Sequence, residues 1–346
     1  MENNILKNFF DNMECKKYPV NGVFVFVYND YNTYLDDDPH LEECFDEAEV
    51  HGIMDSVCDL FEETIELPSE RAFVNWCCQN QLTDKKVYVY TMAQYVTGFG
   101  RRTLIPALCE YYGFINLNAN AYASAIGCNK KTMFNLLSIN NLSNILAPTI
   151  FIHQLSEINY KEVCSKLGNH IILKPISESC CIDMVVLKDF TEDVLIQHVT
   201  NLIEKYGYAM VQKYISGKEI GITVFNHNSS MYTMTPMQIV FANGKEYLTH
   251  TDSFYGNYQL EACDVPNELL NICKKMSTSL EFYCTTRYDF RFDGKNYYLF
   301  DISPNPTVNG YTSSNYAART TLQCDHRGIL RLMAYEKISL FEPSLN

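Results

Sequence analysis

The fold of this chain is constrained most by a segment near its C-terminus, residues 287–309, which reads RYDFRFDGKNYYLFDISPNPTVN. Two runs rich in aromatic residues, 288–292 and 296–302, flank the dipeptide Asp293-Gly294. Asp-Gly between two runs in which apolar and polar residues alternate is typical of a tight turn between antiparallel strands. The segment therefore predicts a β-hairpin.

Four polar side chains of this hairpin are predicted to gather on one face. Side chains two residues apart share a face of a strand, so Arg287 and Asp289 project together. Asp301 and Ser303 can project together opposite them. Two carboxylates, a guanidinium and a hydroxyl suit Mg²⁺ and a polyphosphate, because Mg²⁺ takes carboxylate oxygens and shares its remaining positions with substrate phosphates. The alternative interpretation is a hairpin whose polar face is only solvated.

Length and composition predict a soluble protein of several domains. The chain has 346 residues, of which 47% are hydrophobic, enough for two or three domains with buried cores. It contains no apolar run of membrane-spanning length, and its polar start, MENNILKNFFDNMECKK, lacks the apolar core of a signal peptide. We therefore expect a cytoplasmic protein that does not enter a membrane.

The 14 cysteines are scattered along the chain, and none occurs in a CxxC pattern. The two adjacent pairs, Cys77-Cys78 and Cys180-Cys181, cannot easily form a disulfide within the pair. This usage predicts reduced thiols, most of them buried, and no zinc site.

The net charge argues against nucleic acid as a partner. The chain has 27 Lys and Arg against 41 Asp and Glu, a formal net charge of −14. A strongly acidic chain without a basic stripe does not attract nucleic acid or an anionic membrane surface. An anionic ligand would therefore need a local cluster of Lys and Arg.

Residues 1–120 are predicted to form an open α/β domain. The expected elements are an irregular or weakly helical lead-in at 1–20, strands at 22–28, 87–92 and 114–117, and helices at 44–63 and 103–112. Ligands of such sheets bind beyond the carboxyl ends of the strands. The run GFGRR, residues 98–102, lies at such an end, and it either holds a carboxylate or phosphate or is an ordinary turn with exposed arginines.

A small α+β unit is predicted to follow. Its expected elements are helices at 121–137, 160–167 and 191–206 and strands at 150–152, 170–175, 182–187 and 208–215. Lys130 lies in the middle of the first helix, and Lys174 ends the apolar strand HIILKP. A buried, unpaired ammonium is costly, so Lys174 either binds a phosphate or extends to solvent. For Lys130 the alternative is an ordinary surface position on a helix.

The rest of the chain adds a second candidate feature upstream of the hairpin. The expected elements are strands at 220–225 and 231–241, a polar, tyrosine-rich loop at 248–264, and helices at 266–282 and 314–335. The extended stretch QKYISGKE, residues 212–219, can present backbone N–H and C=O groups to a purine edge. Glu219 could then accept hydrogen bonds from ribose hydroxyls, although the pattern does not require a nucleotide.

Four motifs now stand in order along the chain: GCNKKTMFNLL, HIILKPISESCCIDMVVL, AMVQKYISGKE and RYDFRFDGKNYYLFDISPNP. Together they resemble the ATP-grasp superfamily, and most closely its D-alanine–D-alanine ligase-like branch, from roughly Thr97 to the C-terminus. The resemblance implies a fold of mixed α/β and α+β class with three domains. These are a Rossmann-like N-terminal domain (1–120), a small central lid (121–211) and a larger C-terminal catalytic domain (212–346).

The resemblance implies an ATP-dependent carboxylate-amine ligase. Such an enzyme activates a small-molecule carboxylate as an acyl phosphate, which an amine then attacks, and it releases ADP and phosphate. ATP and Mg²⁺ are the implied cofactors, amino acids are the expected substrates, and a homodimer is left open. The alternative is a catalytically impaired ATP-grasp protein that still binds nucleotide.

The resemblance also assigns site residues, with Arg287 implied to stabilise the transferring phosphoryl group. The residues implied to contact ATP are Lys130 and Lys174 at the phosphates, Glu178, Ser179, Cys180 and Cys181 in the loop over them, Gln212, Lys213, Tyr214 and Ile215 in the adenine hinge, and Glu219 at the ribose. The residues implied to bind magnesium are Asp289, Asp301 and Ser303, with Asn305 as a substitute.

The chain departs from the family pattern at several of these positions. The phosphate loop is usually rich in glycine and serine, whereas this chain has Ser179-Cys180-Cys181 there. Gln212 stands where the hinge usually begins with glutamate, and Ser303 stands at an asparagine position. The glycine-serine-glutamate signature for the first D-alanine is also missing from the N-terminal part. The sequence therefore predicts a ligase whose substrates differ from two D-alanines.

Overall fold

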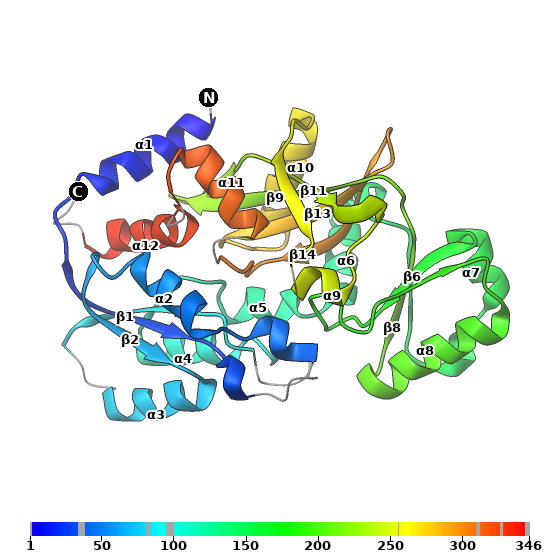
Figure 1. The fold of residues 1–346 in the computed structure, drawn as a ribbon, viewed down its shortest axis with the longest axis horizontal. Coiled ribbons are helices and arrows are strands. Elements are labelled where there is room, and N and C mark those ends of the chain that lie inside the picture. The colour runs from blue at the N-terminus through cyan, green and yellow to red at the C-terminus, as the bar shows by residue number, and fades with distance from the viewer. Residues whose placement is uncertain are drawn as a thin grey trace.

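The computed structural model describes residues 2–33, 39–80, 84–94, 100–254, 256–308, 312–325 and 328–342. Within these residues the strands form a four-stranded parallel sheet, a four-stranded antiparallel sheet and a six-stranded antiparallel sheet. In Figure 1 the parallel sheet lies at the lower left, the six-stranded sheet at the centre and the other antiparallel sheet at the right.

The parallel sheet is built from residues in the first third of the chain. Its strand order is β2-β1-β3-β4, and the strands are β1 (Val20–Val27), β2 (Phe61–Leu67), β3 (Lys86–Thr91) and β4 (Ile115–Asn116). The predicted strand β1 lies at the centre, where Phe24 and Phe26 contribute to one core and Val23, Val25 and Val27 to the other. A continuous apolar run is needed here because helices cover both faces of a parallel sheet. The helices of this part are α2 (Glu47–Asp55), α3 (Glu70–Asn80) and α4 (Leu104–Tyr112).

The prediction of one helix over 44–63 was wrong. Helix α2 ends at Asp55, and the edge strand β2 begins at Phe61. Only Phe61 is fully buried in the strand sequence FEETIEL, so its exposed acidic residues resembled the polar face of a helix. Helix α3, which the periodicity did not indicate, follows directly after β2.

The lead-in is also more regular than expected, because it forms helix α1 (Glu2–Glu14). Leu6, Phe10 and Met13 are buried on one face of this helix at spacings of four and three residues. The helix packs against α11 (Ser313–Leu322) and α12 (Gly328–Phe341) from the other end of the chain (Figure 1). These two helices replace the single helix expected over 314–335.

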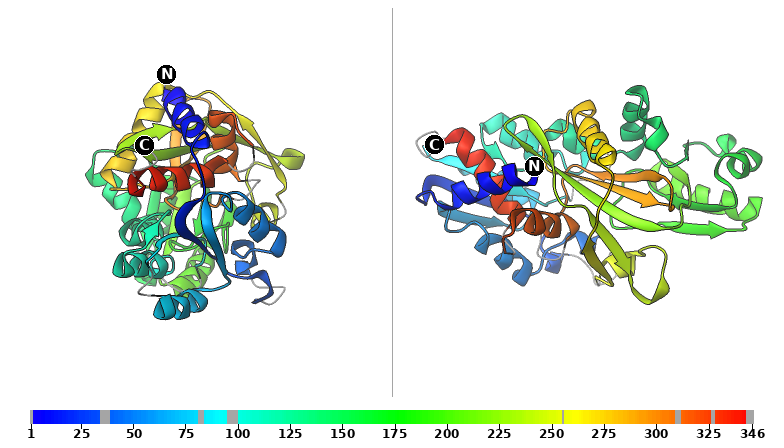
Figure 2. Two further views of the ribbon diagram at one scale, coloured as in Figure 1. Left: turned by 90° about the vertical axis from the view of Figure 1, so that its left-hand side faces the viewer. Right: turned by 90° about the horizontal axis from the view of Figure 1, so that it is seen from above.

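The four-stranded antiparallel sheet projects at one end of the molecule (Figure 2). Its strand order is β5-β8-β6-β7, and its elements are β5 (Thr149–Ile152), β6 (His170–Lys174), β7 (Val185–Lys188), β8 (Ala209–Lys213), α7 (Tyr160–Leu167) and α8 (Glu192–Tyr206). Helix α8 begins after Thr191, which accepts from Val194 N, and ends at Gly207 with φ +74°. Glycine suits this left-handed position because it has no Cβ. The strands and the two later helices of the predicted small α+β unit are thus present, whereas the helix expected at 121–137 packs into the core of the six-stranded sheet.

The six-stranded sheet is the scaffold for the hairpin. Its strand order is β12-β11-β9-β13-β14, with β10 paired to β9, and its strands are β9 (Lys218–His227), β10 (Ser230–Thr233), β11 (Met237–Phe241), β12 (Tyr258–Ala262), β13 (Thr286–Phe292) and β14 (Tyr297–Ser303). Helix α10 (Asn267–Ser279) packs on this sheet. The single strand expected at 231–241 is two strands, and the expected loop at 248–264 contains α9 (His250–Phe254) and β12.

The helix expected over 121–137 is interrupted. It consists of α5 (Ala121–Gly127) and α6 (Lys130–Ile139), and the Asn129 side chain caps α6 by accepting from Thr132 N. A Cβ at Gly127 would lie 2.2 Å from Pro304 Cγ, so only glycine fits where α5 meets the end of β14. Lys130 is therefore the first residue of a helix and not the middle of one.

Short 3₁₀ turns occur at Tyr31–Thr33, Pro39–Glu43, Ser143–Ile145, Leu155–Glu157 and Ala242–Gly244. Every helix in the described part of the chain is too short or too polar to span a lipid bilayer.

Candidate functional site

The β13–β14 hairpin is present, and it places the four predicted polar positions opposite one another. Asp289 pairs with Asp301 and Arg287 with Ser303, and the register shifts by one residue immediately beyond Asp289. The turn is closed by Asp293, whose carboxylate accepts from two backbone N–H groups of the loop at 2.7 and 2.8 Å. The four polar positions of the predicted face therefore lie side by side on two adjacent strands.

Arg287 and Asp289 form a bidentate ion pair on this face. Arg287 Nε lies 2.7 Å from Asp289 Oδ1, and Arg287 Nη2 lies 2.9 Å from Oδ2. Burial alone would lower the pKa of Arg287, but the Asp289 carboxylate more than offsets this effect and raises it. The guanidinium is thus held in one orientation and stays charged.

Two lysines from different elements approach the end of β14. Lys130 Nζ lies 3.6 Å from Asp301 Oδ1 and donates to Glu178 O at 2.7 Å, while Lys174 Nζ donates to Phe300 O at 3.1 Å. Burial would raise the pKa of Asp301, but the charges of Lys130 and Lys174 lower it below its ordinary value. Burial lowers the pKa of Lys174 to about 8. The predicted phosphate lysines and the hairpin carboxylates thus form one electrostatic cluster.

The predicted adenine hinge follows strand β8. Gln212 is buried and donates to Thr149 Oγ1 at 2.9 Å, so its side-chain amide is bound within the four-stranded antiparallel sheet. Tyr214 stacks on His170 with ring centroids 3.9 Å apart. The Lys213 side chain is exposed, and Ile215 is buried.

Glu219 has a partner that the sequence did not indicate. Arg291 Nη2 lies 2.8 Å from Glu219 Oε2, and Arg291 Nη1 donates to Gly217 O at 3.2 Å and to Glu246 O at 2.8 Å. Arg291 lies two residues beyond Asp289 on β13, so the alternation that grouped Arg287 with Asp289 could have included it. The arginine ties the β8–β9 turn to the segment before α9.

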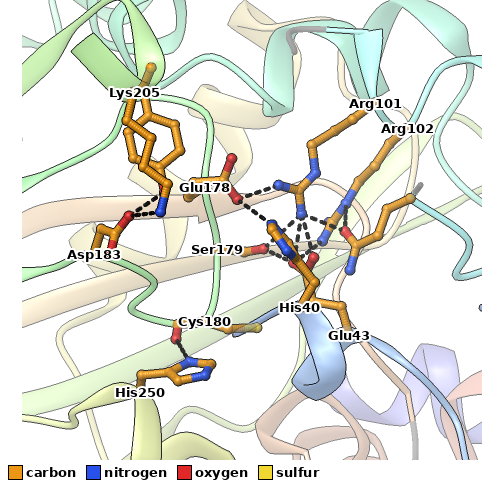
Figure 3. Close-up of polar contacts among 12 residues, drawn as sticks. His40, Glu43, Arg101, Arg102, Glu178, Ser179, Cys180, Asp183, Lys205 and His250 are labelled. Atoms are coloured by element: carbon orange, nitrogen blue, oxygen red, sulfur yellow. Dashed lines mark hydrogen bonds and ion pairs between the residues drawn. The ribbon is translucent and has the colours of Figure 1, made fainter. Parts of the chain in front are cut away.

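The predicted phosphate loop is held by residues from the N-terminal part of the chain, as Figure 3 shows. Arg101 Nη2 bonds to both carboxylate oxygens of Glu43 at 2.6 and 2.7 Å, and Arg101 Nη1 bonds to Glu178 Oε2 at 2.6 Å. Ser179 Oγ donates to Glu43 and accepts from Arg101 at 3.3 Å. We call these four residues the loop clasp. Sequence reasoning missed Glu43, because nothing local marks it.

The loop clasp tests the two interpretations of the GFGRR run, an anion site or an exposed turn. Arg101 is only 5% exposed and is bound by two carboxylates, so it is neither an exposed turn residue nor an unpaired anion site. Burial would lower the pKa of Arg101, but Glu43 and Glu178 raise it. Gly98 and Phe99 lie outside the described residues.

The two cysteines of the loop lie in a strained backbone conformation. Cys180 and Cys181 have φ values of +51° and +56°, in the left-handed region that side chains other than glycine rarely adopt. The ring Nδ1 of His250, on α9, lies 2.9 Å from Cys180 O (Figure 3). The loop is thus fixed from both sides by side chains of other elements.

Ser303, a predicted magnesium ligand, and Asn305, its predicted substitute, lie in different surroundings. Ser303 pairs with Arg287 at the end of the hairpin. Asn305 is buried, and its Oδ1 accepts from Asn118 Nδ2 at 2.6 Å. The Asn305 amide oxygen is therefore bound to the N-terminal part of the chain.

The donor set at Asp289 and Asp301 fits Mg²⁺ held jointly with a polyphosphate. Within the described ranges no group of three or more His, Cys, Asp or Glu side chains could hold a metal ion. Mg²⁺ commonly binds through one or two carboxylates and takes its remaining ligands from substrate phosphates and water. Two carboxylates paired across β13 and β14, with two lysines beside them, match that pattern.

The architecture is that of the D-alanine–D-alanine ligases. The D-alanine–D-alanine ligase from Bacillus anthracis, in complex with ATP, aligns with a TM-score of 0.69 and 15% identity over 93% of this chain and 99% of that one. D-alanyl-alanine synthetase A from Vibrio cholerae aligns at 0.68 and 13% identity (93% and 100% covered), and the VanG D-Ala:D-Ser ligase from Enterococcus faecalis at 0.64 and 12% (92% and 100%). No protein-family model matches the sequence, and no curated protein matches it in sequence.

These structures confirm the predicted fold class, the ATP-grasp fold with mixed α/β architecture. At 12–15% identity the likeness concerns the fold. The roles of the individual site residues remain predictions.

Proposed function

We propose that this protein is an ATP-dependent ligase that joins a small carboxylic acid to an amine, with amino acids as the expected substrates. One observation carries the proposal: Arg287, Asp289 and Asp301 share one face of the hairpin, and Lys130 and Lys174 converge on the same place. The ATP-grasp fold, and the ATP bound to the Bacillus anthracis ligase, support ATP as the phosphoryl donor.

The proposed reaction has two steps. A carboxylate oxygen of the first substrate attacks the γ-phosphorus of ATP, so that an acyl phosphate forms and ADP leaves. The amine of the second substrate then attacks the acyl carbon, phosphate leaves with the bonding electrons, and the amine nitrogen releases a proton to solvent. Lys130 and Lys174 bind phosphate oxygens, and Arg287 neutralises charge that develops on the transferring group. Asp289 and Asp301 would hold Mg²⁺, which neutralises the polyphosphate when bound.

A coupled assay of ADP release tests this function. The full chain is mixed with Mg²⁺ and ATP, and a panel of amino acids and small amines is added singly and in pairs. Release of ADP that requires both a carboxylic acid and an amine, with a condensed product found by mass spectrometry, supports the ligase. Absence of substrate-dependent ADP across the panel counts against it for those substrates.

A second candidate function is nucleotide binding without turnover. It is favoured by Ser303, whose hydroxyl is a weaker Mg²⁺ ligand than an amide oxygen, and by Asn305, whose amide oxygen is bound to Asn118. Calorimetry would then detect ATP binding although no substrate provokes ADP release. Trapping of an acyl hydroxamate with hydroxylamine would exclude this second function, because only an activated acyl group gives that product.

A further inference from the structure

A cavity of about 230 Å³ lies away from the candidate site, between the N-terminal part of the chain and its last helix. The polar residues of its lining are Glu110 of α4, Asn116, Asn118, Asn120, Tyr283 and Lys337 of α12. Pockets for drug-sized ligands usually measure about 300–1,000 Å³, so this one suits a smaller solute. Three asparagines and a lysine make its lining polar.

Lys337 is the positively charged side chain of this lining. It makes no hydrogen bond or ion pair with any residue in the described part of the chain. The neighbouring carboxylate of Glu336 is bound to His227 and to Asn228 N. Lys337 is partly buried, and this burial lowers the pKa of its ammonium although Glu336 and Cys284 oppose the shift. A partly buried ammonium in this state gains from an anionic partner.

Some of the other polar side chains of the cavity already form hydrogen bonds within the protein, and others can bind a solute. Asn116 donates to Ala119 O at 2.9 Å, and Asn118 donates to Asn305 Oδ1, so each of these amides has one N–H already bonded. Asn120 accepts from Ala123 N through its Oδ1, which leaves its Nδ2 as a donor. Tyr283, 55% exposed, adds a hydroxyl. Asn120 and Tyr283 can therefore each offer a hydrogen-bond donor to a bound solute.

The lining also contains one carboxylate, Glu110. It is exposed, and its Oε1 accepts from Ala121 N at 3.3 Å. Lys337 of α12, by contrast, is partly buried. Solvent screens an exposed charge more strongly than a partly buried one, which favours Lys337 over Glu110 as the charge that a bound solute meets.

We propose that this cavity binds a small oxyanion, a carboxylate or a phosphate, with Lys337 as its charged contact. Asn120 Nδ2 and the Tyr283 hydroxyl supply neutral donors to the same anion. The site differs from the candidate ATP site in position and residues, and Asn118 connects the two through its bond to Asn305. It therefore goes beyond the proposed ligase function and does not depend on it.

Isothermal titration of the full chain with inorganic phosphate and, separately, with acetate tests the site in the absence of ATP. Each titration is run on the wild type, Lys337→Met and Lys337→Gln. The matched control is Lys275→Met, which removes an exposed lysine of α10. We expect at least one anion to bind the wild type and the control alike, and the Lys337 variants to bind it about tenfold more weakly or not at all.

Two results would overturn the site. One is the absence of heat from either anion with the wild type. The other is binding that persists unchanged in both Lys337 variants, which would place the anion among the other cations of the chain. Thermal unfolding of each variant separates loss of binding from loss of fold, and Lys337→Gln keeps a polar group where Lys337→Met does not. Binding of acetate alone or phosphate alone would identify the anion.

Discussion

The hairpin face and loop 178–183 differ in what holds their side chains in place. On the hairpin, Arg287, Asp289 and Asp301 occupy adjacent strands, and the hydrogen-bond register fixes their relative positions. The loop contains three residues at positive φ, and side chains from distant parts of the chain fix it. One half of the proposed site is therefore set by local structure, and the other half by tertiary contacts.

This difference has consequences for stability and mobility. A ladder of backbone hydrogen bonds is lost only when the sheet opens, whereas a loop held by a few ion pairs can open alone. We therefore expect substitutions in the loop clasp to release the loop while the hairpin stays folded. Substitutions on the hairpin face should impair chemistry while both regions stay in place.

The largest expected effect is that of Arg101→Met. It removes the main counter-charge of the buried Glu43 and the partly buried Glu178, although Arg102 and His40 stay within 3.6 Å of them. Breaking a buried ion pair from one side costs about 3–5 kcal/mol. We expect the free energy of unfolding in urea to fall by that order. Amide hydrogen exchange should accelerate in loop 178–183 more than in β13.

An arginine outside the clasp provides the control for this prediction. Arg71 on α3 is exposed, so Arg71→Met is expected to change the free energy of unfolding by no more than about 0.5 kcal/mol. Equal acceleration of exchange in the loop and in β13 of Arg101→Met would contradict the separation of the two regions. Adding Glu178→Gln to Arg101→Met should recover part of the lost stability, since it removes one of the stranded charges.

Arg287→Ala comes next, and its effect is expected on turnover. Removing one preorganised charge that stabilises a transition state typically costs about 10²–10³-fold in kcat, or about 2.7–4 kcal/mol. ATP affinity should fall much less, because the charge is needed most as the phosphoryl group transfers. Steady-state ADP release and equilibrium ATP binding measure the two effects. Equal losses in both would assign Arg287 to ground-state binding, and Arg287→Lys controls for charge without the bidentate geometry.

Lys174→Met should act on nucleotide binding. A hydrogen bond to a charged group contributes about 1.5–3 kcal/mol, so ATP affinity should fall by roughly tenfold or more. Unchanged affinity would mean that Lys174 serves only its contact with Phe300 O.

The pH dependence of Lys174 gives this assignment a sharper test. Burial lowers its pKa to about 8, against about 10.4 in an unfolded chain. ATP affinity should therefore decrease as pH rises through about 8, because the ammonium loses its charge. The contribution of Lys174 to the free energy of unfolding runs the other way: it is fully present above about pH 10.4 and is lost as pH falls through about 8. Both trends should disappear in Lys174→Met.

The same contrast explains how much of this molecule could be predicted from its sequence. The hairpin and the grouping of Arg287 with Asp289 follow from alternation and a turn dipeptide, which are local signals. The register does not, because it depends on a shift of one residue immediately beyond Asp289. Arg291 follows the same alternation, so the sequence could have predicted its place on this face as well. The Arg101–Glu43 pair joins residues 58 positions apart, and Arg101–Glu178 joins residues 77 apart, so no local pattern marks them.

Local signals also failed where tertiary packing decides the secondary structure. Strand β2 has few buried residues and exists because it pairs with β1, and its acidic sequence alone resembles the polar face of a helix. Lys130 was placed in mid-helix because the periodicity does not show the break after Gly127, which packs closely against the distant Pro304. The correct predictions thus concern short-range geometry, and the errors concern contacts between distant segments.

The smallest effect is expected at the far end of the loop, where Asp183 pairs with Lys205 at 2.5 Å (Figure 3). The hydrogen bond from Lys205 to Asp183 raises the pKa of Lys205 to about 12. Both side chains are exposed, at 57% and 41%, so the pair competes with water and salt. Lys205→Gln should lower the free energy of unfolding by only about 0.2–1 kcal/mol, and high salt should remove the difference. A loss as large as that of Arg101→Met would show that the loop is anchored at both ends, and the clasp would no longer be its main support.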